Sequence, residues 1–306
     1  MTHPYLFWIG FHILIICMLV LDLRGFHRKS HIVRRREALL LTLFWVAIAL
    51  LFNVFVYYAI SPNAALEFFT GFLIEKSLSI DNLFVFLLVF SYFKIPPYLQ
   101  HKVLFWGILG AIFFRITLIL LGVQFIQEFH WATTLLGVVL LTTGVKFALQ
   151  KEQQMRPEKN IIVRLVRKVL PLSEKEDTAQ FFVKEKGRWK MTTLFLVHLT
   201  IESADVIFAL DSIPAIFAIT NDAFIVYTSN IFAILGLRSL YFVLSGYFNK
   251  LRFFKYGLAA ILVFIGSKML LMKFYDMSLF LCLGIVVAIL AATTGLSLLY
   301  PLKKKN

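Results

Sequence analysis

The stretch LVHLTIESADVIFALDSIPAIFAIT, residues 196–220, contains the two features that decide the fold class. It is long and apolar enough to cross a bilayer, which takes about 20 mostly apolar residues. It also contains three acids, Glu202, Asp205 and Asp211. A charge at the centre of a membrane helix costs about 2.5–3.5 kcal/mol on insertion scales, so acids in such a place indicate a functional site.

A second stretch, GFLIEKSLSIDNLFVFLLVF at residues 71–90, resembles the first around its acid. Three charged positions then recur in both halves of the chain: Asp81 and Asp205, Arg115 and Arg238, and Lys146 and Lys268. The acid-to-arginine spacings are 34 and 33 residues, and the arginine-to-lysine spacings are 31 and 30 residues. This agreement predicts an internal repeat.

Each predicted repeat contains three membrane spans, an odd number, so the second copy has to cross the membrane in the opposite direction. Inverted repeats are a common architecture of secondary transporters, in which the substrate binds near the bilayer midplane between the repeats. For Lys146 and Lys268 the simplest interpretation is that each extends its ammonium group to the nearer membrane surface.

The composition is that of an integral membrane protein. Of its 306 residues, 60% are hydrophobic and 16% are charged, whereas soluble domains contain roughly 25% charged residues. We predict an all-α integral membrane protein with about nine transmembrane helices, at residues 4–22, 38–60, 64–93, 103–126, 130–150, 191–220, 223–247, 256–274 and 277–300. The net charge of +14 would indicate nucleic acid in a soluble protein, but the basic residues lie between the spans, so no nucleic-acid partner is predicted.

The repeats divide the chain into five predicted parts. These are two N-terminal spans with a basic loop (1–60), the first three-helix repeat (64–150), a polar loop (151–190), the second, inverted repeat (191–274), and a final span with a basic tail (275–306). Loop residues near Ile161–Leu170 are predicted to form a short amphipathic helix.

The distribution of basic residues predicts the orientation. The loops after the first, third, fifth and seventh spans and the C-terminal tail are basic, whereas the opposite side has Lys273 alone. Because basic loops stay in the cytoplasm, the N-terminus is predicted outside and the C-terminus in the cytoplasm.

Five acids and five bases lie within the predicted spans. The acids are Glu75, Asp81, Glu202, Asp205 and Asp211, and the bases are Lys76, Arg115, Lys146, Arg238 and Lys268. Internal salt bridges are one explanation, with Asp81 paired to Arg115 and Asp205 to Arg238. That explanation leaves the other three acids without a partner, so we also consider a binding site.

The spacing of the acids in the sixth span favours a shared site. His198, Glu202 and Asp205 fall at positions i, i+4 and i+7, along one face of a helix. Pro214 removes a backbone hydrogen bond, so a helix break there is predicted to turn Asp211 toward the same cavity.

The predicted ligand atoms are mostly oxygens, from these carboxylates, from Asn82 and from nearby serine hydroxyls. Such sets suit Mg²⁺, Ca²⁺ or Mn²⁺, and a nitrogen ligand from His198 would favour Mn²⁺. The alternative for His198 is a simple hydrogen bond to Glu202. Arg115 and Arg238 are interpreted as charge-balancing residues.

Enzyme motifs are absent from the sequence: there is no P-loop, Gly-x-Ser-x-Gly, His-Glu-x-x-His or Cys-x-x-Cys. We therefore predict no enzymatic activity and no permanently bound cofactor. Cys17 and Cys282 lie in separate apolar stretches and predict no disulfide framework.

Several of these segments are similar to those of a known family. Residues Glu75–Asn82 and Asp205–Pro214 resemble the two signature stretches of the TerC family, as do Leu21–Leu23, Phe26–Arg28 and Val103–Gly107. The resemblance covers nearly the whole chain and is greatest with the Alx-like branch, which has nine spans and a long cytoplasmic loop.

The resemblance implies a bacterial inner-membrane protein, related to the lysine-exporter superfamily and associated with Mn²⁺ efflux. The family is named after tellurite resistance, but a site rich in acids is poorly suited to an oxyanion. The metal-site acids implied by the two signature stretches are Glu75, Asp81, Glu202, Asp205 and Asp211.

The predicted function is thus a secondary transporter that exports a divalent metal, Mn²⁺ above others, in exchange for protons. Its partners are membrane lipid and the metal ion. One alternative is a membrane-embedded metallation or assembly partner of exported proteins, which would bind other proteins through loop 151–190. Another is a salt-bridged scaffold without a substrate.

Overall fold

The computed structural model describes the backbone of residues 5–26, 35–129, 131–149, 171–173, 178–185, 187–245, 253–272 and 277–299. Within these ranges the side chains of residues 21–26, 35, 81, 84, 127, 211, 254, 255 and 298 are not described. The predicted amphipathic helix at 161–170 and the side chains of Asp81 and Asp211 therefore lie outside the described residues.

The described chain is almost entirely helical. Its helices are α1 (Tyr5–Phe26), α2 (Arg35–Ala59), α3 (Pro62–Tyr92), α4 (Pro97–Glu128), α5 (Ala132–Leu149), α7 (Thr193–Phe217), α8 (Ala223–Leu235), α9 (Leu237–Leu244), α10 (Phe254–Leu271) and α11 (Leu279–Leu299). Each predicted span contains a described helix, and the seventh span contains two, because α8 and α9 are separated at Gly236 by a bend of 41°.

Length and composition identify an all-helical membrane protein. Five described helices, α2, α4, α5, α7 and α11, are long and apolar enough to cross a membrane, and α8 with α9 makes a sixth if the bent pair is one span. Shorter apolar helices occupy Tyr5–Val20 and Tyr256–Leu271. Nine spans thus remain a prediction.

Local sequence signals fix the ends of the central helices. α3 begins with Pro62 in its first turn, and the Ser61 hydroxyl accepts a hydrogen bond from the Ala64 amide at 3.0 Å. Thr192 caps α7 in the same way, and Asp222 caps α8. Such caps satisfy amide groups that have no partner within the first turn of a helix.

Pro214 does not break α7, contrary to the sequence-based expectation. The helix continues through it to Phe217, and the Ala218 amide donates to the Pro214 carbonyl at 3.2 Å. A proline inside a helix cannot donate its own backbone hydrogen bond, and its ring crowds the carbonyl four residues earlier, but neither effect ends the helix here. The helix then ends within one turn, at Phe217.

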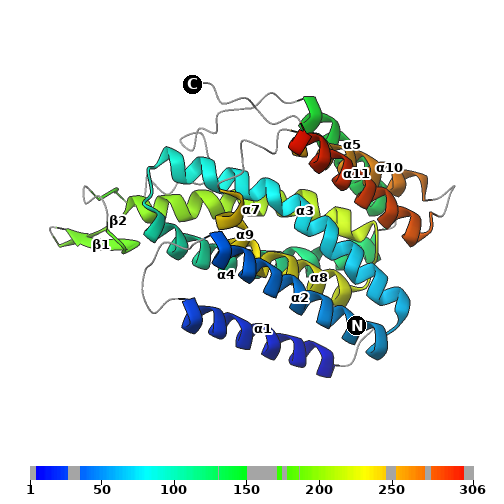
Figure 1. Ribbon diagram of the computed structural model, residues 1–306, viewed down its shortest axis with the longest axis horizontal. Helices are drawn as coiled ribbons and strands as arrows, with labels where there is room; N and C mark the ends of the chain where they lie inside the picture. The colour runs from blue at the N-terminus through cyan, green and yellow to red at the C-terminus, as the bar shows by residue number, and fades with distance from the viewer. Residues whose placement is uncertain are drawn as a thin grey trace.

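A β-hairpin lies in the polar loop before α7 and was not predicted. Strand β1 (Phe182–Glu185) pairs antiparallel with β2 (Arg188–Met191), and Gly187 turns the chain with a φ of 78°. In Figure 1 the hairpin projects from one end of the helical bundle.

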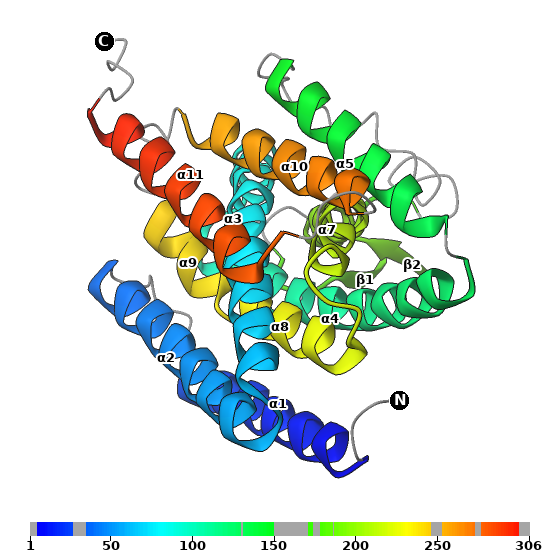
Figure 2. The same cartoon turned by 90° about the vertical axis from the view of Figure 1, so that its right-hand side faces the viewer.

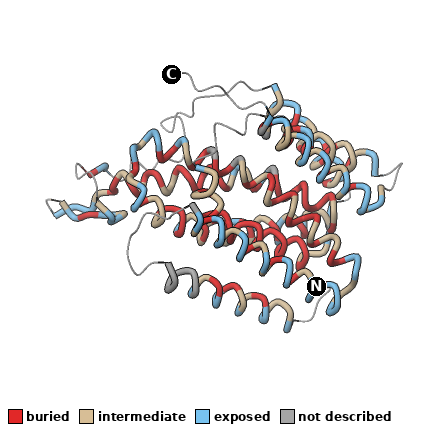
Figure 3. The backbone as a smooth tube through the Cα atoms, in the orientation of Figure 1, coloured by how far each residue is buried: buried red, intermediate tan, exposed pale blue. Residues whose placement is uncertain are grey.

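The helices form two groups. α3 and α7 lie in the centre and contact each other; α8 packs on α3, and α4 packs on both α7 and α8. α2 covers α3 and α9, while α5 packs mainly on α10, which also contacts α11 (Figures 1 and 2). Figure 3 shows buried residues concentrated in the central helices and more exposed residues on the outer ones. Many of the exposed residues are large and apolar, as expected for lipid contact.

Candidate functional site

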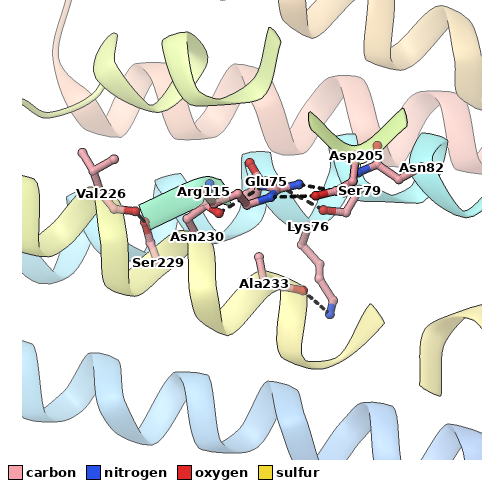
Figure 4. A network of polar contacts seen from close by, with 10 residues as sticks. All are labelled: Glu75, Lys76, Ser79, Asn82, Arg115, Asp205, Val226, Ser229, Asn230 and Ala233. Carbon is pink, nitrogen blue, oxygen red and sulfur yellow. Dashed lines mark hydrogen bonds and ion pairs between the residues drawn. The ribbon is translucent and has the colours of Figure 1, made fainter. Parts of the chain in front are cut away.

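Arg115 of α4 is the centre of a buried polar cluster (Figure 4). Its side chain is 0% exposed. The guanidinium donates to Glu75 of α3, to Asp205 of α7 and to Asn230 of α8, so that a single base joins four helices. A buried arginine is tolerated only when its donors are paired, and each partner here supplies an oxygen.

Asp205 accepts two bonds from Arg115. They come from Nη2 to Oδ1 at 3.3 Å and from Nε to Oδ2 at 3.4 Å, in the two-pronged geometry that matches a guanidinium to a carboxylate. Asn82 Nδ2 donates to the same Oδ1 at 2.9 Å. This bond ties α3 to α7 at the site.

Glu75 makes an ion pair with Arg115 Nη1 and accepts from Ser79 Oγ at 3.3 Å. Its second oxygen, Oε2, has no hydrogen-bond partner among the described atoms. Two buried carboxylates therefore share one arginine. If both carboxylates are ionised, the described cluster has one negative charge in excess.

A cavity of about 60 Å³ lies beside the Glu75 end of this cluster. Its polar walls come from Glu75, Ser79 and Asn82 of α3, from Thr143 of α5 and from Ser212 of α7. The Ser212 hydroxyl, like Glu75 Oε2, has no hydrogen-bond partner in the described part of the chain. A cavity needs only about 10–15 Å³ to hold one water, so this one has room for water or a small cation.

Glu202 lies one turn before Asp205 on α7 and is buried, with 8% of its surface exposed. Neither of its oxygens has a hydrogen-bond partner among the described residues, and the nearest base is His198, whose Nδ1 is 4.0 Å from Oε1. The carboxylate rests on α4, where a Cβ added to Gly110 would lie 2.5 Å from Glu202 Cδ. A side chain at position 110 would therefore have to displace the Glu202 carboxylate.

A second, smaller cavity of about 20 Å³ adjoins this carboxylate. Glu202 and Asp205 of α7 line it together with Arg238 of α9. The two cavities share no lining residue: the first is bordered by Glu75, and the second by Asp205 and Glu202.

The structure brings some of the predicted residues together and leaves others undetermined. Glu75, Asn82, Asp205 and Arg115 form one bonded cluster, with Glu202, His198 and Arg238 on its flank. The described part of the chain contains no group of three or more acids, histidines or cysteines arranged to hold a metal ion. Arg115 occupies the space between the two described acids of the cluster.

Two contacts of the site were not predicted. Arg115 pairs with Asp205 of the other predicted repeat, whereas the salt-bridge interpretation paired each acid with the arginine of its own repeat. Lys76 donates to the Ala233 carbonyl at 3.0 Å, beside the break between α8 and α9. A positive group is favourable at the C-terminal end of a helix.

Comparison with known proteins finds a matching family and similar bacterial membrane proteins. Residues 60–305 match the family described as "Integral membrane protein TerC family". The chain is 47% identical over 292 residues to an uncharacterized membrane protein of Myxococcus xanthus, covering 95% of this chain and 92% of the relative. It is 46% identical over 298 residues to an Escherichia coli (strain K12) protein named Alx and proposed as a membrane-bound redox modulator, covering 94% and 92%. No solved structure matches the chain.

Proposed function

The chain belongs to the TerC family of integral membrane proteins, and on this basis we propose that it is a secondary transporter that exports a divalent cation from the cytoplasm, Mn²⁺ above others, in exchange for protons. The observation that supports this most is the pairing of one buried arginine with two buried carboxylates from α3 and α7. In this proposal a cation that binds between these acids neutralises the negative charge of the carboxylates, which Arg115 neutralises when no cation is bound.

The free oxygens around the cluster support a cation as the cargo. Glu75 Oε2 and Ser212 Oγ border the larger cavity without partners, and both Glu202 oxygens lack partners on the flank. Carboxylate, amide and hydroxyl oxygens are the ligands preferred by Mg²⁺, Ca²⁺ and Mn²⁺. His198 beside Glu202 adds a nitrogen, which favours Mn²⁺. Asp81 and Asp211 complete the proposed ligand set.

Proton exchange follows from the cost of buried charge. After the metal leaves, several carboxylates face one another at low dielectric, and protons neutralise those that Arg115 and Arg238 do not balance. In this proposal each transport cycle exchanges metal for protons at the same acids.

The helix contacts support the inverted repeat on which alternating access depends. Under the predicted correspondence α3 matches α7, α4 matches α8, and α5 matches α10. Exchanging the repeats converts the contact of α3 with α8 into that of α7 with α4, and both contacts are extensive. Among α3, α4, α5, α7, α8 and α10, the remaining large contacts, α3 with α7, α4 with α8 and α5 with α10, each join a helix to its own counterpart.

In this proposal the protein lies in the bacterial inner membrane with its N-terminus outside. The positive-inside rule supports this orientation, and all the relatives named above are bacterial proteins. The name of the E. coli relative describes a redox modulator. A thiol-based form of such a role has little support in this chain. The chain has two cysteines, Cys17 on α1 and Cys282 on α11, helices at separate edges of the bundle (Figure 2).

A second candidate function, metallation or assembly of exported proteins, is favoured by the hairpin. Trp189 on β2 is 62% exposed, and Phe182 on β1 is 39% exposed, which suits a surface that binds another protein. Deletion of residues 178–190 distinguishes the two functions. A transporter keeps its metal flux without the hairpin, whereas a metallation partner loses delivery to its client.

The proposed function is tested by Mn²⁺ flux into proteoliposomes that contain the purified protein and an imposed pH gradient. We expect flux that follows the gradient and is lost in Asp81→Asn and in Asp211→Asn, both of which still insert. Flux in both variants equal to that of the wild type would refute the site assignment. Absence of flux from the wild type, with Mn²⁺ binding retained, would favour the metallation partner.

A further inference from the structure

Helices α5 and α10 touch through their backbones. A Cβ added to Gly144 of α5 would lie 2.9 Å from the Val263 amide nitrogen and 3.0 Å from the Ala259 carbonyl oxygen. A Cβ added to Gly266 of α10 would lie 2.6 Å from the Leu141 nitrogen. Glycines at a membrane helix interface let two backbones approach this closely and pack tightly.

The same interface is two-fold symmetric at the level of single atoms. The counterpart of Gly144 is Gly266, 122 residues later in the chain. At the same separation the counterparts of Ala259 and Val263 are Gly137 and Leu141. Gly144 faces the carbonyl of Ala259, and Gly266 faces the carbonyl of Gly137 at 2.9 Å. Reciprocal contacts of this kind are the mark of a two-fold axis, so α5 and α10 form one tight, symmetric body.

The attachment of this body to the central helices is not symmetric. Lys268 Nζ, on α10, donates to the carbonyl of Ala218 at 2.9 Å, at the C-terminal end of α7. Lys146, its counterpart on α5, is exposed and has no hydrogen bond or ion pair to any residue that the structure describes. Simple extension of both lysines to the membrane surface predicts similar surroundings for the two, which is not the case.

The carbonyl of Phe93, at the C-terminal end of α3, corresponds to the carbonyl of Ala218 at the end of α7. The amide of Phe93, the residue after α3, donates to the carbonyls two and four residues before it, and the amide of Ala218 does the same after α7. α3 and α7 run in opposite directions, so these two helix ends lie at opposite ends of the bundle (Figure 1).

The α5–α10 body is too short to reach both ends at once. Both of its helices have 18 residues, about 27 Å at 1.5 Å per residue, whereas α3 has 31 residues, about 46 Å. In Figure 1 the body lies beside the half of α3 that is farther from the hairpin, where α7 ends. The cavity beside Glu75 lies between this body and the central helices, with walls from α3, α5, α7 and α10.

We propose that α5 and α10 move as one body between two docking positions on α3 and α7, with Lys268 bound to the end of α7 in one position and Lys146 bound to the end of α3 in the other. This inference rests on the proposed transport function and specifies its moving part. Because the body forms one wall of the cavity beside Glu75, its movement exposes the acid cluster to opposite sides of the membrane in turn.

Cross-linking in native membranes tests the two positions. In a variant with Cys17 and Cys282 replaced by alanine, one cysteine pair is Lys268→Cys with Ala218→Cys, and the other is Lys146→Cys with Phe93→Cys. A bifunctional methanethiosulfonate whose spacer is about as long as a lysine side chain links the two cysteines of a pair when they lie close together. Intact-protein mass spectrometry then measures the fraction of linked molecules. Lys146→Cys with Ala218→Cys is the matched control for random collision.

We expect both pairs to cross-link and the control pair not to, and each bridge to stop Mn²⁺ flux until it is reduced. Lys268→Met, added to the second pair, removes a hydrogen bond from a charged donor. The ratio of the two docked forms then shifts by about tenfold toward the bridge at α3. Lys146→Met, added to the first pair, shifts the ratio toward the bridge at α7.

Cross-linking of the first pair without the second would overturn the proposal, provided that Lys146→Cys with Tyr92→Cys, which keeps Phe93, also fails to cross-link. A bridge at α3 that leaves flux unchanged would overturn it as well. The cross-links are measured without any substrate. A wild type that moves no Mn²⁺ therefore refutes the transport function, while the two pairs still decide the movement.

Discussion

Arg115 of α4 and Asp205 of α7 form a buried two-pronged ion pair that joins the two predicted repeats. The same guanidinium holds Glu75, so the described cluster places one base between two acids. Removal of the arginine is therefore expected to cost more stability than removal of either acid. Loss of either acid leaves a balanced pair, whereas loss of the arginine leaves two buried carboxylates without their cation.

Arg115→Met is expected to destabilise the protein by about 3–5 kcal/mol, the usual cost of removing one partner from a buried ion pair. Glu75→Gln is the control and is expected to cost clearly less, since Arg115 keeps Asp205. Thermal unfolding of the two variants in the same detergent measures the difference. Equal stability of the two would show that Arg115 does not balance both acids.

Glu202→Gln is expected to abolish metal flux with little loss of stability. No described residue forms a hydrogen bond with either Glu202 oxygen, so the substitution breaks no bond that holds the fold, while it removes a charge available to cargo. Glu128→Gln, at the exposed end of α4, is the control and should change neither property. A Glu202→Gln protein with full flux would remove Glu202 from the site; one that unfolds would give it a structural role.

The helices were predictable from sequence because an apolar run of about 20 residues specifies a membrane helix by itself. The sequence also allowed the prediction of one polar cluster with Glu75, Asn82, Asp205 and Arg115, since charged groups inside a membrane pair with one another. It did not predict which acid pairs with which base. Arg115 meets Asp205 of the other unit, and that choice depends on how α4 packs on α7, which spacing along the chain does not contain.

Two local predictions illustrate the same limit. Proline chemistry predicted a break at Pro214, but α7 continues through it, and the chain bends instead at Gly236 between α8 and α9. There Lys76 of α3 donates to the Ala233 carbonyl and stabilises the end of α8 from another helix. The β1–β2 hairpin was missed because its apolar residues form a short run within a charged loop.

Gly110→Ala is expected to lower metal flux and to leave folding nearly unchanged. The new methyl group would collide with the Glu202 carboxylate, which is the end of a flexible side chain and can move aside. Its displacement changes the site without straining the backbone. Gly107→Ala is the matched control, because its methyl group would lie at an ordinary 3.8 Å from Glu202 Oε1. Flux assays of the two variants at equal protein content should separate them, and equal flux would show that the position of Glu202 does not matter.

Gly144→Ala and Gly266→Ala are expected to show the opposite pattern, with a loss of stability. At both positions the added methyl group meets backbone atoms of the facing helix, at 2.9 Å from Val263 N and 2.6 Å from Leu141 N, so one helix has to move away from the other. Forcing an extra methyl group into a packed interface typically costs about 1–3 kcal/mol. Gly284→Ala on α11 is the control, since nothing lies within 4 Å of its added methyl group. Because the interface is symmetric, the two variants should be destabilised to a similar extent in thermal unfolding. A large loss in one and none in the other would contradict the two-fold relation between α5 and α10.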